Sequence, residues 1–247
     1  MHTTARMWAL LALLGAAGCG ADERSVAPSA SPDRDVRQEA RLPPGKGHML
    51  ARVRAPVLVH DAPGGRPIAR LRRRTPFGKP RVHAIHEVRT NGRWLGIHSP
   101  VLPNRRTGWI ENDGAKLALT RSAISLHVDL GKKRIDLRRG SRTVRRIEIA
   151  IGRAGTSTPP GRFQVTDKLR GGRFPAGSYG CCILALSARQ PNLPQGWPGG
   201  DRIAIHGTPF DQTIGSAASN GCLRATDREL RILMRDVPAG SPVMITR

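Results

Sequence analysis

Two residues in the carboxy-terminal part of the chain, His206 and Cys222, have side chains that together could carry out nucleophilic acyl transfer. A free cysteine thiol has a pKa of about 8.5, so only a few per cent is thiolate at neutral pH. A catalytic cysteine therefore needs a neighbouring histidine that takes its proton or holds it in an ion pair. The two residues lie sixteen positions apart, and a loop between them could bring them together.

The residues that flank Cys222 suit the same chemistry. Gly221 lets the backbone approach a substrate carbonyl closely, and the N–H groups of Asn220, Gly221 and Cys222 could form an oxyanion hole. A lone cysteine is usually a small hydrophobe, and a lone histidine is usually a core residue with its hydrogen bonds made. Neither residue indicates catalysis by itself, but the two with their flanks favour it.

A helix is predicted directly after this segment. Thr226 and Glu229 have the spacing of a capping box, which marks a helix start. The apolar residues that follow at helical spacing are Leu230, Leu233, Met234 and Val237. They form one face that would pack on a sheet. Cys222 then lies on a loop entering the helix. If the helix points its N-terminus toward that loop, its dipole would modestly favour a thiolate.

Most of the remaining sequence predicts short strands in two folded segments. The first segment, 48–117, has strand patterns at 51–60, 81–89, 93–98 and 108–111, which suggest a small barrel. Trp94 and Trp109 are expected in its core. The second segment, 119–247, begins with a β-meander at 124–128, 134–137 and 143–151. Further strands are expected after a turn at 158–163 and at 182–186, 202–205 and 243–245.

The pair His206-Gly207, followed by Ser219-x-Gly221-Cys222-Leu223-Arg224, resembles the catalytic motif of the bacterial L,D-transpeptidases. The strands of the second segment and the turn Thr158-Pro159-Pro160-Gly161-Arg162-Phe163 resemble the same family, so the resemblance covers about residues 120–247. In the first segment, NGRWLGIHS followed by TGWI resembles bacterial SH3-like modules. The implied fold is mainly β: a small SH3-like barrel, then a sandwich-like or barrel-like catalytic domain with one clear helix after the nucleophile loop.

The resemblance also implies a role for each motif residue. Cys222 would be the nucleophile, His206 its proton acceptor, and the main-chain carbonyl of Gly207 would orient the imidazole. Ser219 would shape the loop, and Arg224 would hold the loop or meet a substrate carboxylate. Asn220 departs from the family, because many members have a second histidine there. A role for a histidine at that position is therefore in doubt, but the nucleophile is not.

The implied reaction is peptidoglycan cross-linking. Cys222 would attack the third residue of a tetrapeptide stem, expel the terminal D-alanine and leave a thioester, which an amine of a neighbouring stem would resolve as a 3→3 cross-link. No metal or organic cofactor is needed, and carbapenems would acylate Cys222. Three alternatives stay open: L,D-carboxypeptidase activity with water as acceptor, attachment of a protein to the wall, and a non-catalytic wall-binding lipoprotein.

The amino terminus predicts export. Residues 1–18 combine a short apolar run with small residues ahead of Cys19, which resembles a lipoprotein signal with Cys19 as the lipidated residue. An ordinary signal peptide is the alternative. Residues 19–47 are rich in Pro, Ser, Ala and charge and would be a flexible linker. We expect a membrane-anchored protein of the cell envelope that faces the wall.

The formal net charge of +23 suits a wall protein, because stem carboxylates, phosphate-bearing wall polymers and anionic lipids are negative. Nucleic acid is not an expected partner, because export removes the chain from the genome and no nucleic-acid motif is present. The run 72–74 of three arginines is interpreted as a solvated loop. His83 and His86 lack further ligands, so no metal site is predicted.

The chain has four cysteines. If Cys19 is lipidated, Cys181, Cys182 and Cys222 remain, an odd number with at least one free thiol. The adjacent pair is expected to be a poor disulfide, because neighbouring Cα atoms lie about 3.8 Å apart, below the usual ~4.4–6.8 Å. Packing of both in a strand is the simpler interpretation, and a bridge from either one to Cys222 stays open.

Overall fold

A computed structural model describes residues 39–173, 178–193 and 200–247, all of which belong to one compact unit, Arg37–Arg247. The predicted signal segment 1–18, the lipidation site Cys19 and most of the 19–47 linker lie outside the described residues. Within the described residues, no helix has the length and apolar character that crossing a membrane would require.

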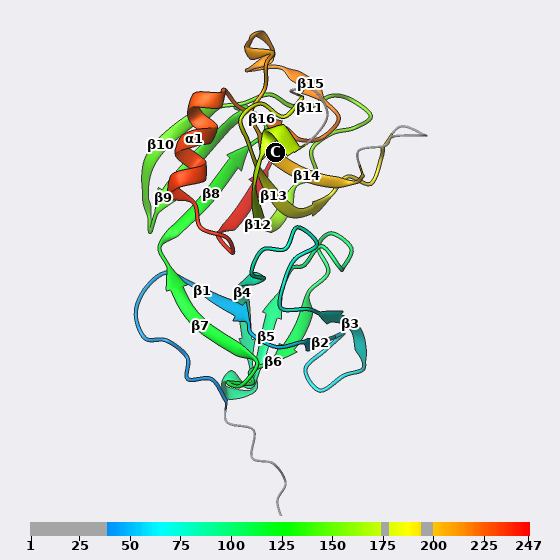
Figure 1. The fold of residues 1–247 in the computed structure, drawn as a ribbon, viewed down its shortest axis with the longest axis vertical. Helices are drawn as coiled ribbons and strands as arrows, with labels where there is room; N and C mark the ends of the chain where they lie inside the picture. Colours follow the sequence, from blue (N-terminus) through cyan, green and yellow to red (C-terminus); the bar gives the residue numbers. More distant parts are fainter. Residues whose placement is uncertain (1–38, 174–177, 194–199) are drawn as a thin grey trace, which may run out of the picture. The chain divides into compact units, whose positions relative to one another are not determined.

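The described chain is mainly β, as predicted, and its strands form two large sheets (Figure 1). The first sheet has seven strands in the order β3-β2-β6-β5-β4-β1-β7. Their bounds are β1 His48–Val53, β2 Val57–His60, β3 Pro67–Leu71, β4 Val82–Arg89, β5 Trp94–Ile97, β6 Gly108–Glu111 and β7 Leu117–Ser122. We call residues 48–122 the first module. Trp94 and Trp109 are both buried, as the sequence predicts.

The second sheet has eight strands in the order β10-β9-β8-β17-β12-β13-β14-β16, and a small two-stranded sheet pairs β11 with β15. Their bounds are β8 Ile124–Asp129, β9 Arg134–Arg139, β10 Arg142–Glu148, β11 Ile151–Gly152, β12 Gly161–Arg170, β13 Cys182–Arg189, β14 Arg202–His206, β15 Ala217–Ser219, β16 Leu223–Arg224 and β17 Pro242–Thr246. The predicted meander is confirmed, because β8, β9 and β10 are successive antiparallel neighbours. We call residues 123–247 the second module.

Three strand predictions differ from the structure. The predicted strand 51–60 breaks between β1 and β2, where Pro56 has no N–H and the N–H of Arg54 instead donates to Lys116 O at 2.7 Å. The predicted strand 143–151 likewise divides into β10 and β11. The first sheet also runs past the predicted end at 117, because β7 pairs with β1 along its whole length, from Leu117 to Ser122.

The predicted helix is confirmed as α1, Asp227–Asp236. The Thr226 hydroxyl accepts a hydrogen bond from the Glu229 N–H at 3.3 Å, so the cap forms as the capping box predicts. Leu230, Leu233 and Val237 are fully buried in the core of the second sheet. Burial of this face fixes the helix start next to the segment that carries Cys222.

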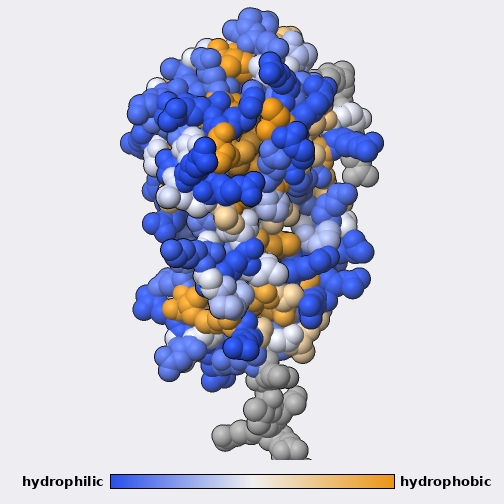
Figure 2. All heavy atoms as spheres, turned by 90° about the vertical axis from the view of Figure 1, so that its left-hand side faces the viewer, coloured by the Kyte–Doolittle hydropathy of each residue, from blue (hydrophilic) through white to orange (hydrophobic). Residues whose placement is uncertain are grey.

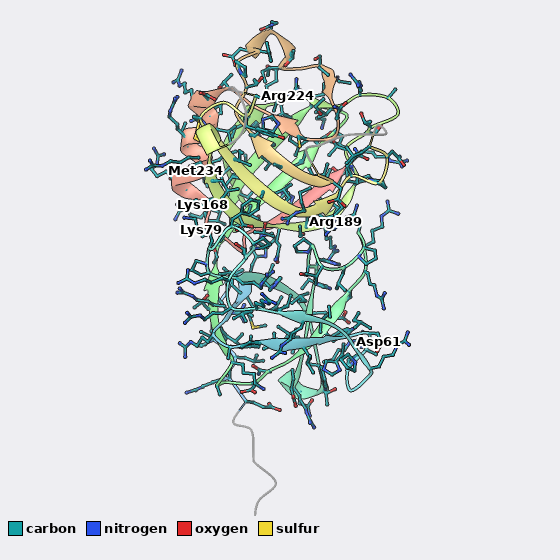
Figure 3. All side chains as sticks on the ribbon, turned by 45° about the vertical axis from the view of Figure 1, so that its right-hand side comes forward. Asp61, Lys79, Lys168, Arg189, Arg224 and Met234 are labelled. Carbon is teal, nitrogen blue, oxygen red and sulfur yellow. A yellow bond between two sulfur atoms is a disulfide. The ribbon has the colours of Figure 1, made fainter. Side chains whose placement is uncertain are left out.

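The two modules are joined by buried hydrogen bonds. Gln164 on β12 accepts from the Ala84 N–H at 2.5 Å, and its amide nitrogen lies 2.8 Å from His83 Nδ1. On another side, Asn104 of the first module makes a two-point contact with the main chain of Arg189, at 2.6 and 2.9 Å. Arg189, labelled in Figure 3, also donates to the Pro100 carbonyl. The first module is therefore tied directly to the last residue of β13.

Candidate active site

His206 and Cys222 are brought together by a parallel strand pair. His206 is the last residue of β14, and Cys222 directly precedes β16. The two strands are paired in parallel, and their register sets His206 beside Arg224. Because side chains alternate along a strand, Cys222 and Arg224 emerge on the same face as His206. All three line one pocket of about 110 Å³. Figure 3 labels Arg224 in the second module.

The imidazole of His206 is held in one orientation. The residue is 3% exposed, and its Nδ1 lies 2.6 Å from the Gly207 carbonyl oxygen, to which it donates. Nε2 is then the ring nitrogen left to accept a proton. Burial lowers the pKa of His206 to about 4, and the bond to Gly207 opposes this shift only in part. The imidazole is therefore neutral at neutral pH.

The thiol of Cys222 is free and lies among buried groups. Burial raises the pKa of Cys222, while a hydrogen bond with the Ala204 backbone and the charge of Arg224 act in the opposite direction. Both members of the pair are thus neutral at rest. This state favours transfer of the thiol proton to His206 during attack over a resting ion pair, the two possibilities that the sequence leaves open.

Ser219 holds the loop that carries Cys222. Its hydroxyl donates to the Cys222 carbonyl at 2.6 Å and accepts from the Gly221 N–H at 3.0 Å. Thr158 donates to the Gly221 carbonyl at 2.8 Å, from the turn that resembles the family's. The Gly221 N–H is already bonded, so the oxyanion-hole hypothesis narrows to the N–H groups of Asn220 and Cys222.

Gln190, which follows β13, is a second support of this loop that sequence reasoning missed. The residue is 4% exposed, and its amide nitrogen lies 2.9, 3.1 and 3.3 Å from the carbonyls of Thr156, Ser157 and Asn220. Gly221 has φ +114°, and a Cβ there would lie 2.3 Å from this nitrogen. A single glutamine after a strand carries no sequence signal, because the carbonyls it binds come from two distant segments.

We expect Gln190→Ala to lower the free energy of unfolding by about 2–3 kcal/mol, because buried carbonyls lose their shared donor. The same change should lower the acyl-transfer rate, since the Cys222 loop loses a fixed contact. Urea unfolding with an activity assay measures both effects. Gln212→Ala, at an exposed glutamine, is the matched control. If the two variants have the same free energy of unfolding, Gln190 does not support the Cys222 loop.

Two further predicted residues, Asn220 and Arg224, line the pocket. Arg224 Nε and Asn220 Oδ1 are buried without a hydrogen-bond partner in the described part of the chain, and both residues line the pocket. The main chain of Arg224 is fixed by reciprocal hydrogen bonds to Ala150, each 2.9 Å. Arg224 therefore carries an unpaired donor and Asn220 an unpaired acceptor, on residues that line the same pocket as Cys222.

Tyr179 also borders the pocket, although it is not among the predicted site residues. Its ring meets the His206 ring edge to face, with centroids 4.8 Å apart. Burial and the neighbouring Cys222 raise the pKa of Tyr179. The aromatic ring therefore limits access of water to the imidazole on one side.

The expectation that Cys181 and Cys182 make a poor disulfide is wrong. The structure joins them in a disulfide across a Cα–Cα separation of 3.8 Å. That separation is set by the trans peptide that links them, and the bridge closes within it. The Cys181 N–H donates to Asp227 Oδ1 at 2.8 Å, and the Gly207 N–H donates to the Cys182 carbonyl at 3.1 Å. Among the residues that the structure describes, Cys222 is then left without a disulfide partner.

Comparison with known proteins identifies the family of the second module. The profile of the L,D-transpeptidase catalytic domain matches residues 123–245. Residues 123–245 are an L,D-transpeptidase catalytic domain. The protein assigned as L,D-transpeptidase YkuD of Bacillus subtilis is 32% identical over 120 residues, which are 49% of this chain and 64% of that protein. ErfK/SrfK of Salmonella typhimurium, with the same assignment, is 30% identical over 118 residues, 43% of this chain and 38% of that protein.

The chain thus spans less than two thirds of the length of these relatives. An L,D-transpeptidase structure from Mycobacterium smegmatis is 13% identical, with a TM-score of 0.42, over 67% of this chain and 90% of that chain. Another, solved in complex with imipenem, is 12% identical with the same TM-score, over 62% of this chain and 90% of that chain.

The pH dependence of this L,D-transpeptidase domain should reflect the lowered pKa of His206. The imidazole must be unprotonated to accept the thiol proton, and its pKa is about 4 instead of 6.5. We therefore expect kcat/KM to be retained as the pH falls through 6 and to be lost near pH 4. A pH profile of D-alanine release, with NMR titration of the histidine ring, measures this. Loss of activity between pH 6 and 7 would contradict it.

Proposed function

We propose that the chain is a peptidoglycan L,D-transpeptidase that forms 3→3 cross-links through a thioester on Cys222. One observation carries the proposal. The free thiol of Cys222, just before β16, and the imidazole of His206, at the end of β14, line the same pocket, and Nδ1 of His206 is fixed on the Gly207 carbonyl. This is the pairing of nucleophile, base and orienting group that acyl transfer requires.

In the first half-reaction, Cys222 Sγ attacks the carbonyl carbon of the third stem residue while His206 Nε2 takes the thiol proton. The N–H groups of Asn220 and Cys222 stabilise the oxyanion. When the tetrahedral intermediate collapses, the C–N bond breaks and His206 returns the proton to the leaving D-alanine amine. A thioester on Cys222 and a neutral imidazole are left.

In the second half-reaction, an amine of a neighbouring stem attacks the thioester carbonyl and gives a proton to His206. The C–S bond breaks, and Cys222 recovers the proton as a thiol. Arg224, which lines the pocket, would bind a carboxylate or carbonyl oxygen of a stem, and Asn220 would accept a substrate N–H. Water in place of the amine gives L,D-carboxypeptidase activity, and a protein amine gives attachment to the wall.

The remaining parts of the chain are assigned by the same proposal. Residues 1–18 would direct export, Cys19 would carry the lipid anchor, and the linker would let the enzyme reach the wall from the membrane. The first module would be SH3-like and would bind wall peptides or support the catalytic domain. Its contact with Arg189, next to Gln190, favours the supporting role.

Mass spectrometry of purified tetrapeptide stems incubated with the full chain tests the function. A cross-linked dimer with released D-alanine supports transpeptidation, and trimmed monomer alone supports the carboxypeptidase. Stems left intact would favour the non-catalytic wall-binding lipoprotein.

The same proposal includes acylation of Cys222 by carbapenems. Intact-mass analysis should show the adduct on the wild type, and an equal adduct on Cys222→Ala would contradict that part.

A further inference from the structure

A groove of about 840 Å³ outside the active-site pocket is lined by five arginines. They are Arg52, Arg54, Arg73, Arg74 and Arg121, and all five are exposed. No aspartate or glutamate is among the residues that line it. We call these five residues and the space between them the cationic groove.

The floor of the cationic groove is a sheet surface. Leu50 and Arg52 lie on the same face of β1, and Arg52 is paired with Val82 on one side and Ala118 on the other. The turn after α1, which includes Pro238 and Ala239, also lines it. The next residue, Gly240, packs directly on this floor, since a Cβ there would lie 2.6 Å from Val82 Cγ1. Sheet and turn therefore make a fixed concave surface.

The loop that carries Arg73 and Arg74 is held by a buried arginine. Arg81 is 8% exposed, and its guanidinium donates to the carbonyls of Arg72 at 2.8 Å and Arg74 at 3.1 Å. The Arg81 N–H donates to the Arg73 carbonyl at 2.9 Å. Thr75 fixes the end of the loop by donating to Asp167 at 2.5 Å. The side chains of Arg72, Arg73 and Arg74 are solvated, as predicted, but each of their backbone carbonyls accepts a hydrogen bond from Arg81.

The charges in the cationic groove are not neutralised by the protein. Within the described residues, none of its five arginines forms an ion pair with an acidic side chain, whereas Arg145 pairs with Glu229 and Arg189 with Asp201. Arg121 lines the groove from β7, but its guanidinium donates to the Pro43 and Gly47 carbonyls, so the field of the groove comes mainly from the other four arginines. Like charges around one concave surface repel one another, and the concave shape concentrates their field. Both effects favour a bound anion that spans several of them.

We propose that the cationic groove binds a linear, phosphate-bearing polyanion. The guanidinium fork matches phosphate oxygens bidentately, and Arg is preferred over Lys for this recognition. A chain-like ligand can enter a groove whose floor is the sheet, whereas the headgroups of a flat bilayer meet only its rims. This binding goes beyond the acyl transfer proposed above and does not involve Cys222 or His206.

Binding of the full chain to inorganic polyphosphate, measured by calorimetry at low and physiological salt, tests the proposal. Arg73→Gln/Arg74→Gln removes two groove charges. Arg142→Gln/Arg146→Gln removes two exposed charges from β10 at the edge of the other sheet and is the matched control. We expect the groove variant to lose at least about tenfold in affinity and the control less than about threefold. Figure 2 shows why this control is needed, because hydrophilic residues cover much of the face that includes α1.

Three results would overturn the proposal. Equal losses in the two variants would mean binding by net charge alone. Stronger binding to vesicles of phosphatidylglycerol than to polyphosphate would mean a lipid surface, and stronger binding to polygalacturonate would mean a carboxylate polymer. Both variants should keep the wild-type melting temperature and D-alanine release. Cys222→Ala should keep polyphosphate binding, so failure of the groove and failure of the proposed enzyme activity are told apart.

Discussion

Replacing Cys222 with alanine is expected to lower D-alanine release from tetrapeptide stems by at least about 10³-fold, because no other side chain at the site can form the thioester. Cys181 and Cys182 cannot substitute, since they are joined to each other. Coupled detection of free D-alanine measures the rate, and intact-mass analysis measures the acyl-enzyme. Both signals should fall to background in the variant.

A stability measurement separates loss of chemistry from loss of fold. The Cys222 side chain packs against a small cluster of Leu169, Ile183 and Ala204, so alanine should leave the melting temperature close to that of the wild type. Cys222→Ser is the conservative companion, and it should also be inactive because a hydroxyl ionises far less readily than a thiol. Activity of Cys222→Ala within tenfold of the wild type would exclude it as the nucleophile.

Replacing His206 with glutamine should lower the same rate by about 10²–10⁴-fold. The glutamine amide can still donate to the Gly207 carbonyl but cannot accept the thiol proton. Burial raises the pKa of Cys222, so the thiol of this variant stays protonated at neutral pH and has no base to take its proton. The residual rate should therefore rise steadily toward alkaline pH, where the thiol ionises unaided, while the wild type shows no such dependence in that range.

His127→Gln is the matched control, because His127 is a partly buried histidine on β8 that does not line the active-site pocket. Its activity and pH profile should match those of the wild type. A His206→Gln variant that retains the wild-type profile would show that the imidazole positions the loop without moving a proton.

One short path of hydrogen bonds connects the first module to the active-site pocket. Asn104 holds the main chain of Arg189, and the next residue, Gln190, holds the carbonyl of Asn220 in the nucleophile loop. Rigid support of this kind keeps reacting groups in place without contributing to the chemistry. The first module therefore has a structural reason to be present beside the catalytic domain, whatever it binds.

The sequence alone determined the features whose cause is local. Thr226 and Glu229 specify a helix cap within one turn, alternating apolar residues specify strands such as 124–128, and the segment 219–224 carries the family motif with Cys222 inside it. These signals depend on residues only a few positions apart. The pairing of Cys222 with His206, sixteen positions away, came from the family motif, which includes both residues.

Only the tertiary structure decided what surrounds that pair. Gln190 acts on carbonyls some thirty residues away in both directions, Tyr179 reaches His206 from another segment, and the arginines of the cationic groove come from three separate strands and loops. The pKa of His206 depends on burial, which no local pattern reports. Contacts between distant segments are fixed when the sheets pack, so their chemistry is visible only after the chain has folded.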